Sequence, residues 1–168
     1  MGCGDTLLTL SANAKINLTL DILGTREDGY HEVAMIMQEI SLHDTLSMGK
    51  INQGISLTIV IEGQQGTLPA DESNLCWKAA ALVQKEYNLQ EGVEIHLTKR
   101  IPMAAGLAGG SADAAAVLKG MNHLFRLGMT EARLCELGAR LGSDIPFCIM
   151  GGTMLATGRG EILTRLPS

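Results

Sequence analysis

Hydrophobic and polar positions alternate along several stretches of the first hundred residues. In residues 16–22, Ile and Leu occupy every second position and Asn, Thr and Asp fill those between. A period of two residues indicates a half-buried β-strand. The turn-forming residues 25–29 follow, and Gly29 is able to take a positive φ there. The same alternation predicts further strands over residues 33–42, 55–61 and 93–98.

Three later stretches repeat apolar residues with helical spacing. The first, over residues 75–86, follows Ser73 and Asn74, two residue types favoured at helix N-caps. The second is an alanine-rich stripe over residues 114–125, and we expect its helix to begin near Ser111. A third helix is expected between Thr130 as its N-cap and Gly142 as its end. Strands followed by helices predict one α+β domain over residues 1–168, with helices packed on a mixed sheet.

Bulk composition excludes several classes of protein. The chain has 168 residues, 46% of them hydrophobic, which is too apolar for intrinsic disorder. No uninterrupted apolar run approaches the ~18 residues of a membrane span. The formal charge is -5 and no basic run is present, so neither nucleic acid nor a membrane is an expected partner. Without a leader pattern we expect a cytoplasmic protein. Its dispersed cysteines are expected to be reduced core residues: Cys3, Cys76, Cys135 and Cys148.

Glycine is over-represented and concentrated in loops. The chain has 20 glycines in 168 residues, and many lie in residues 106–110 and 151–160, against an average usage of about 7%. In residues 99–113 a predicted strand ends, Pro102 stops ladder pairing, and small residues lead into the helix near Ser111. Backbone can approach a ligand closely there, and the helix N-terminus favours an anion such as polyphosphate. The loop matches neither a Walker A motif nor a GxGxxG fingerprint, and a simple packing turn remains the alternative.

Three further segments carry polar residues that a core would not select. Lys15 and Asn17 lie on an otherwise apolar strand, and Tyr30 and His31 follow the first turn. Asp144 stands between a helix end and an apolar run. Taken singly, each of them reads as a solvated side chain or a turn cap.

Together these segments resemble the galactokinase, homoserine kinase, mevalonate kinase and phosphomevalonate kinase superfamily. The resemblance is carried by AKINLTLDI at 14–22, DGYHE at 28–32, KRIPMAAGLAGGSADAAA at 99–116 and LGSDIPFCIMGGTMLATGRGE at 141–161. The glycine-rich string alone is similar to the superfamily at large. The first two strings with GSD narrow the resemblance to the kinases that act on 4-diphosphocytidyl-2-C-methyl-D-erythritol.

The resemblance implies the fold, the cofactors and the site. The fold would be the ribosomal protein S5 domain 2-like fold of the superfamily's N-terminal domain, with ATP and Mg²⁺ as cofactors. Lys15 and Asp144 match the catalytic pair, Asn17 contacts substrate, and Tyr30 and His31 hold the cytosine end. Ser111 would also approach Mg²⁺. The residues that match the ATP site are Asn74, Leu75, Lys99, Pro102, Met103, Ala104, Ala105, Gly106, Leu107, Ala108, Gly109, Gly110, Ser111 and Ala112. Ala104, Ala105 and Ala108 replace glycines of many members, which is conservative if their φ angles are negative.

The implied activity is ATP-dependent phosphorylation of the 2-hydroxyl of 4-diphosphocytidyl-2-C-methyl-D-erythritol, in non-mevalonate isoprenoid biosynthesis. The alternatives are another kinase of the superfamily, acting on homoserine or mevalonate, and a catalytically silent nucleotide-binding domain. An RNA-binding domain of similar topology is disfavoured by the net charge of -5. Superfamily kinases carry a second, C-terminal domain that nothing in this sequence matches. We therefore expect the chain to be an N-terminal domain, with an exposed face that invites self-association.

Overall fold

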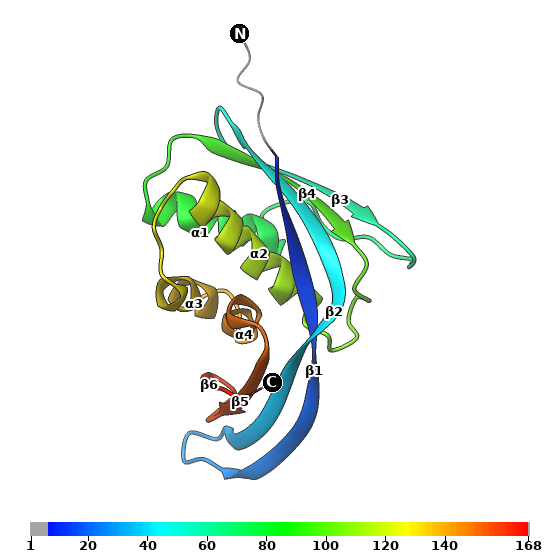
Figure 1. Ribbon diagram of the computed structural model, residues 1–168, viewed down its shortest axis with the longest axis vertical. Helices are drawn as coiled ribbons and strands as arrows, with labels where there is room; N and C mark the ends of the chain where they lie inside the picture. Colours follow the sequence, from blue (N-terminus) through cyan, green and yellow to red (C-terminus); the bar gives the residue numbers. More distant parts are fainter. Residues whose placement is uncertain (1–6, 168) are drawn as a thin grey trace.

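A six-stranded mixed β-sheet forms one layer of the molecule, and helices cover one of its faces (Figure 1). The structure is a computed structural model that describes residues 7–167. In chain order the elements are β1 (Leu8–Thr25), β2 (His31–Ile51), β3 (Ile55–Ile61), α1 (Leu75–Glu86), β4 (Gly92–Lys99), α2 (Gly109–Leu124), α3 (Glu131–Ala139), α4 (Ile145–Met150), β5 (Thr153–Thr157) and β6 (Ile162–Arg165). The predicted α+β class, a mixed sheet packed with helices, is confirmed.

The long strand β2 organises the sheet. It pairs antiparallel with β1 from Leu8↔Met48 to Thr25↔His31, with register shifts that mark bulges. Its C-terminal half also pairs with β4, and residues 35–38 pair with β5. The path order is β3-β4-β2-β5-β6, and β3 with β4 is the parallel pair. Because α1 connects two parallel strands, it lies against the sheet as a crossover helix.

The N-terminal ends of α1 and α3 have the capping residues expected from the sequence, whereas α3 ends at Ala139, three residues before the expected Gly142. The Asn74 side chain accepts a hydrogen bond from the Cys76 backbone N–H at 2.8 Å, and Thr130 does the same for Arg133 at 3.2 Å. Each accepts one of the first-turn N–H groups that a helix leaves unpaired. The helix α2 begins at Gly109, two residues before the expected start, and Gly109 follows the loop directly.

The main core lies between the sheet and the helices. The buried face of α2 packs against β1, β2 and α1. Val117 and Leu118 of α2 belong to the same buried cluster as Leu46 and Ile95 of the sheet. A smaller cluster, formed by Met37, Phe147, Met154 and Ala156, joins β2, α4 and β5. Cys76 is buried, and Cys135 and Cys148 are partly buried; all three are free thiols, as expected, while Cys3 lies outside the described residues.

Two features of the first strand and the C-terminal region differ from expectation. Residues 16–22 form a strand, but Leu18, Leu20 and Ile22 are 55%, 56% and 65% exposed, so the half-buried prediction is wrong there. That part of β1 runs beyond the helices, in the curved lower end of the hairpin (Figure 1). The sequence also did not predict α4, β5 or β6, which are 6, 5 and 4 residues long. Such short segments carry too few periodic positions to be recognised.

No helix within residues 7–167 is long and apolar enough to cross a membrane. The longest, α2, has 16 residues, whereas a span needs about 20.

Candidate functional site

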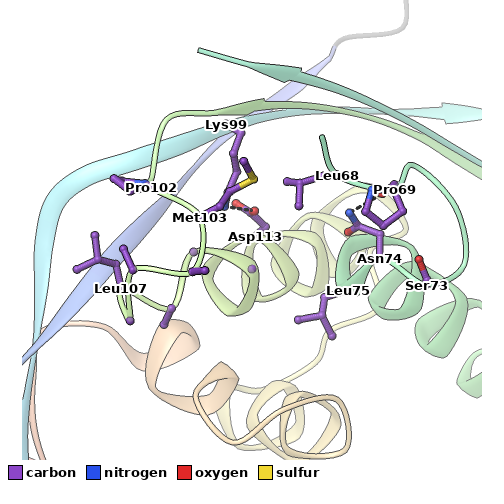
Figure 2. Close-up of a pocket in the computed structure, with 16 residues that line it drawn as sticks. Leu68, Pro69, Ser73, Asn74, Leu75, Lys99, Pro102, Met103, Leu107 and Asp113 are labelled. Atoms are coloured by element: carbon purple, nitrogen blue, oxygen red, sulfur yellow. Dashed lines mark hydrogen bonds and ion pairs between the residues drawn. The ribbon is translucent and has the colours of Figure 1, made fainter. Parts of the chain in front are cut away.

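A cavity of about 390 Å³ opens between the loop from β4 to α2 and the N-terminal end of α1 (Figure 2). This volume lies within the range of about 300–1,000 Å³ typical of small-molecule sites. Most residues expected at an ATP site line it: Asn74, Leu75, Lys99 and the whole of 102–110. Leu68, Pro69, Ser73 and Asp113 complete the lining. Ser111 and Ala112 follow on α2 and do not line the cavity.

The loop turns sharply before α2 through residues in the left-handed region. Gly106 has a φ of 74°, and Ala104 and Ala108 each have a φ of 56°. The condition under which these alanines are conservative replacements, a negative φ, is therefore not met by Ala104 and Ala108. A side chain in this region costs about 1–2 kcal/mol, because its Cβ approaches the following carbonyl oxygen.

The N-terminus of α2 faces the loop without a side-chain cap. Ala108 occupies the N-cap position and has no side-chain acceptor to offer the first-turn N–H groups. These N–H groups and the positive end of the helix dipole favour a negatively charged ligand. With glycine at the first two positions of α2, the backbone there is open to close approach.

Hydrogen bonds from Gln64, in the segment between β3 and α1, and from Lys15, in β1, hold the loop in place. The side-chain amide of Gln64 donates to the Ile101 carbonyl at 3.0 Å and accepts from the Met103 N–H at 3.0 Å. The Lys15 backbone N–H donates to the Leu107 carbonyl at 3.1 Å. Strand β1 therefore contacts the tip of the loop at the residue that the resemblance marks as catalytic.

Three charged side chains are buried together beneath the loop. The Lys99 ammonium donates to Asp44 at 2.5 Å and to Asp113 at 2.7 Å. Burial raises the pKa of Asp113 to about 8, against the lowering effect of Lys99 and with a further raising effect of Asp44. Burial by itself would lower the pKa of Lys99. Asp113, and to a smaller extent Asp44, outweigh this effect, so the pKa of Lys99 is raised. The Lys99 side chain thus points to these carboxylates, although the residue lines the cavity (Figure 2).

The proposed catalytic pair lies beside the loop, outside the cavity lining. Lys15 is 6% exposed, and its ammonium donates to the Asn17 side chain at 3.1 Å. Asp144 precedes α4, and its side chain makes no capping bond. Burial raises the pKa of the Cys148 thiol to about 12, Asp144 raises it further, and Lys119 and Lys15 lower it. The Cys148 backbone N–H donates to the Asp144 carbonyl at 3.1 Å, and residues 7–167 contain no ion pair between Lys15 and Asp144.

Tyr30 and His31 lie apart from the cavity, where the β1–β2 hairpin turns. Both are exposed, and the Tyr30 ring is stacked under the Arg159 guanidinium at 4.9 Å from its centroid. The Asp28 carboxylate accepts a hydrogen bond from the Tyr30 backbone N–H at 3.1 Å, and this bond fixes the turn. The structure therefore brings together the loop, Asn74, Leu75, Lys99 and Lys15, but it does not bring Tyr30 and His31 to the cavity.

Sequence reasoning missed Asp44, Gln64 and Asp113. Asp113 had a usable signal, since it is a carboxylate within the buried alanine-rich face of a helix. Gln64 had none, because polar residues in loops are ordinary. Asp44 lies within β2, beyond the strand that the alternation predicted over residues 33–42.

Nearly the whole chain is similar to known kinases. Residues 74–152 match the family model described as the GHMP kinases N terminal domain. The chain is 53% identical over 161 residues to 4-diphosphocytidyl-2-C-methyl-D-erythritol kinase of Acetivibrio thermocellus, covering 96% of this chain and 56% of that protein. It is 59% identical over 158 residues to the protein of the same name from Synechococcus sp. (strain JA-2-3B'a(2-13)), covering 94% and 50%.

A solved structure agrees with the sequence matches. The crystal structure of a 4-(cytidine 5'-diphospho)-2C-methyl-D-erythritol kinase is similar, with a TM-score of 0.82 and 38% identity. The similarity covers 95% of this chain and 55% of that one. The chain thus spans about half the length of the curated relatives it matches.

Proposed function

We propose that the chain provides the ATP site and the catalytic pair of a kinase that acts on 4-diphosphocytidyl-2-C-methyl-D-erythritol, because residues 74–152 match the GHMP kinases N terminal domain and the chain is 53% identical to one such kinase. The reaction is transfer of the ATP γ-phosphoryl group to the 2-hydroxyl of 4-diphosphocytidyl-2-C-methyl-D-erythritol. It would serve non-mevalonate isoprenoid biosynthesis in the cytoplasm. The observation that carries the proposal is a glycine-rich loop, opening onto a cavity and hydrogen-bonded to the backbone of Lys15.

Phosphoryl transfer asks a protein mainly for alignment and for charge placed around the transferred group. The loop from Pro102 to Ala108 and the first N–H groups of α2 would hold the β- and γ-phosphates. The adenosine would lie toward Asn74 and Leu75 at the start of α1, where the cavity continues. Its apolar lining there, with Leu68 and Pro69, suits a planar base.

Lys15 and Asp144 are proposed to act on the hydroxyl and the phosphoryl group. Asp144 would accept the proton of the attacking hydroxyl and align it. Lys15 would stabilise negative charge on the transferred group, since a buried ammonium acts in a poorly screened environment. Asn17, which accepts a hydrogen bond from the Lys15 ammonium, would contact substrate and orient that ammonium.

The residues present fit a Mg²⁺ ion that arrives with the nucleotide. Within residues 7–167 no group of three His, Cys, Asp or Glu side chains could hold a metal ion. Mg²⁺ commonly binds through substrate phosphates and only one or two protein groups. The Ser111 hydroxyl, in the first turn of α2, would be one of these. The ion supplies neutralisation of charge between the β- and γ-phosphates.

Tyr30 and His31 are proposed to bind the cytosine end of the substrate. Stacking of a base on an aromatic ring contributes about 1–3 kcal/mol. We expect Y30A to raise the KM for the cytidyl substrate while leaving ATP affinity unchanged. An equal loss of ATP affinity would contradict this assignment, because Tyr30 does not line the cavity.

The proposal is tested by an ATP-consumption assay with 4-diphosphocytidyl-2-C-methyl-D-erythritol, homoserine and mevalonate in parallel. Turnover with the first alone is the expected result, and turnover with either other acceptor contradicts the assigned substrate. In D144N we expect ATP binding to remain and turnover to fall by orders of magnitude. Near-normal turnover in that variant would remove Asp144 from the mechanism.

A second candidate is a catalytically silent nucleotide-binding domain, favoured by the position of Lys15 and Asp144 outside the lining of the cavity. Silence with all three acceptors, together with thermal stabilisation by ATP, would support it. ATP at a hundred times its Kd stabilises by about 2.7 kcal/mol, or roughly 5–10 °C for a domain of this size. Absence of any ATP stabilisation would contradict both candidates. The exposed Leu18, Leu20 and Ile22 also make self-association part of what should be measured.

A further inference from the structure

The buried cluster of Lys99, Asp44 and Asp113 connects three separate elements. Lys99 is the last residue of β4, Asp44 belongs to β2, and Asp113 lies in α2. Their exposed fractions are 3%, 0% and 2%. The ammonium is the shared centre, because it donates to both carboxylates.

Asp44 fixes the entry of the glycine-rich loop. Its second carboxylate oxygen accepts the backbone N–H groups of Arg100 and Ile101, the latter at 2.8 Å. These are the first two residues after β4. One carboxylate therefore holds both the Lys99 ammonium and the start of the loop.

Lys99 and Asp113 fix the exit of the loop. Asp113 is one turn into α2, so its bond to Lys99 ties the start of that helix to the end of β4. A Cβ atom at Gly109, the first residue of α2, would lie 2.8 Å from the Lys99 nitrogen. The ammonium thus packs directly against the backbone at which the loop ends.

The cluster is an unfavourable arrangement if stability alone is considered. Two carboxylates share one ammonium, and the Asp113 Oδ1 atom is buried without a hydrogen-bond partner in the part of the chain that the structure describes. Burying charges costs desolvation energy, and well-packed apolar residues in their place are often equally stable or more so. A role in geometry explains the cluster better than a role in stability.

We propose that Lys99, Asp44 and Asp113 are positioning residues, which hold the two ends of the glycine-rich loop at the separation that the nucleotide phosphates require. This inference rests on the proposed nucleotide site. The three side chains act through the backbone of the loop and need no contact with the ligand.

The test compares amide hydrogen exchange, without nucleotide, in the 168-residue chain and its variants. K99M leaves two buried carboxylates facing each other and is expected to unfold the chain, so the informative variant is D113L. It removes the bond to α2, keeps the branching at Cγ, and leaves Lys99 paired with Asp44. D113N keeps an oxygen that can accept from Lys99, and R133M, which removes an exposed ion pair of α3, is the distant control.

In D113L we expect exchange at residues 100–109 to rise about tenfold, while α3 keeps its protection and the melting temperature does not fall. The affinity for ATP, measured by direct titration, should fall about tenfold with it. D113N and R133M should keep the loop exchange of the original chain. A merely structural role would instead raise exchange throughout the domain.

The proposal would be overturned if amide exchange in the loop of D113L equalled that of the original chain. It would also be overturned if loop exchange in D113N rose as much as in D113L. A uniform rise over all elements would do the same. If the original chain fails to bind ATP, the proposed function fails, whereas the exchange measurement still decides whether the cluster positions the loop.

Discussion

Ala104 and Ala108 are expected to destabilise the loop in which they lie, so that glycine at both positions should raise the stability of the protein. Both residues have a φ of 56°, and Ala104 is exposed, so its methyl group contributes little packing. A left-handed alanine costs about 1–2 kcal/mol. Glycine removes this cost but adds about 0.4–1 kcal/mol of chain entropy to the unfolded state.

The expected net gain is about 0.5–1 kcal/mol at each site, or about 1–2 kcal/mol for A104G/A108G. For a domain of this size, that raises the melting temperature by about 2–8 °C. The matched control is A105G, in the same loop, at an exposed residue outside the positive-φ region. There only the entropy of the unfolded state changes, and we expect the melting temperature to fall by about 1–4 °C.

Thermal unfolding of the original chain, A104G/A108G and A105G, followed by circular dichroism or calorimetry, measures these shifts. The reasoning depends on opposite signs for the double variant and for A105G. If A104G/A108G lowers the melting temperature as A105G does, the two alanines are not held in the left-handed region, and the account of the loop is wrong.

Three further outcomes follow from the same region. G109A should lower the melting temperature, because the added Cβ would lie 2.8 Å from the Lys99 nitrogen. G110A should leave the melting temperature unchanged, because its Cβ would lie 3.6 Å from Leu75, an ordinary contact distance. Equal shifts in the two variants would contradict the packing at Gly109. Between about pH 4 and pH 8 the folded chain holds a proton on Asp113 that the unfolded chain has released, since its pKa is raised from 3.8 to about 8. The free energy of unfolding should therefore fall as the pH rises through this window, and it should fall less in D113N. Denaturant titrations at several pH values measure this difference, and equal slopes in the two chains would refute it. T130A should cost about 1 kcal/mol through loss of the α3 cap, and an unchanged denaturation midpoint would speak against that bond.

Much of the local structure could be predicted because its causes are local. Asn74 and Thr130 cap helices in the structure as their residue types predict, since a cap depends on a few neighbouring N–H groups. The strand-to-loop-to-helix transition at 99–109 was also visible, because proline and glycine act on the backbone wherever they stand.

Burial on β1 could not be predicted in the same way. The alternation of Leu18, Leu20 and Ile22 defines one face of a strand, but a face is buried only if another element covers it. The helices cover the other end of the hairpin instead. The short α4, β5 and β6 likewise depend on their positions against α2, β2 and β5, respectively, more than on their own sequences.

The sequence by itself determined that this protein has a sheet with helices and a loop suited to phosphate, and which residues match a kinase. Those properties follow from periodicity, turn chemistry and motif, which act over a few residues. Only the tertiary structure decided that Lys99 turns its ammonium to Asp44 and Asp113, and that Ala104 and Ala108 are left-handed. The first depends on residues 55 and 14 positions apart in the chain meeting at one buried point. The second depends on a loop whose two ends are already fixed, so that the backbone between them must turn whatever residues it carries.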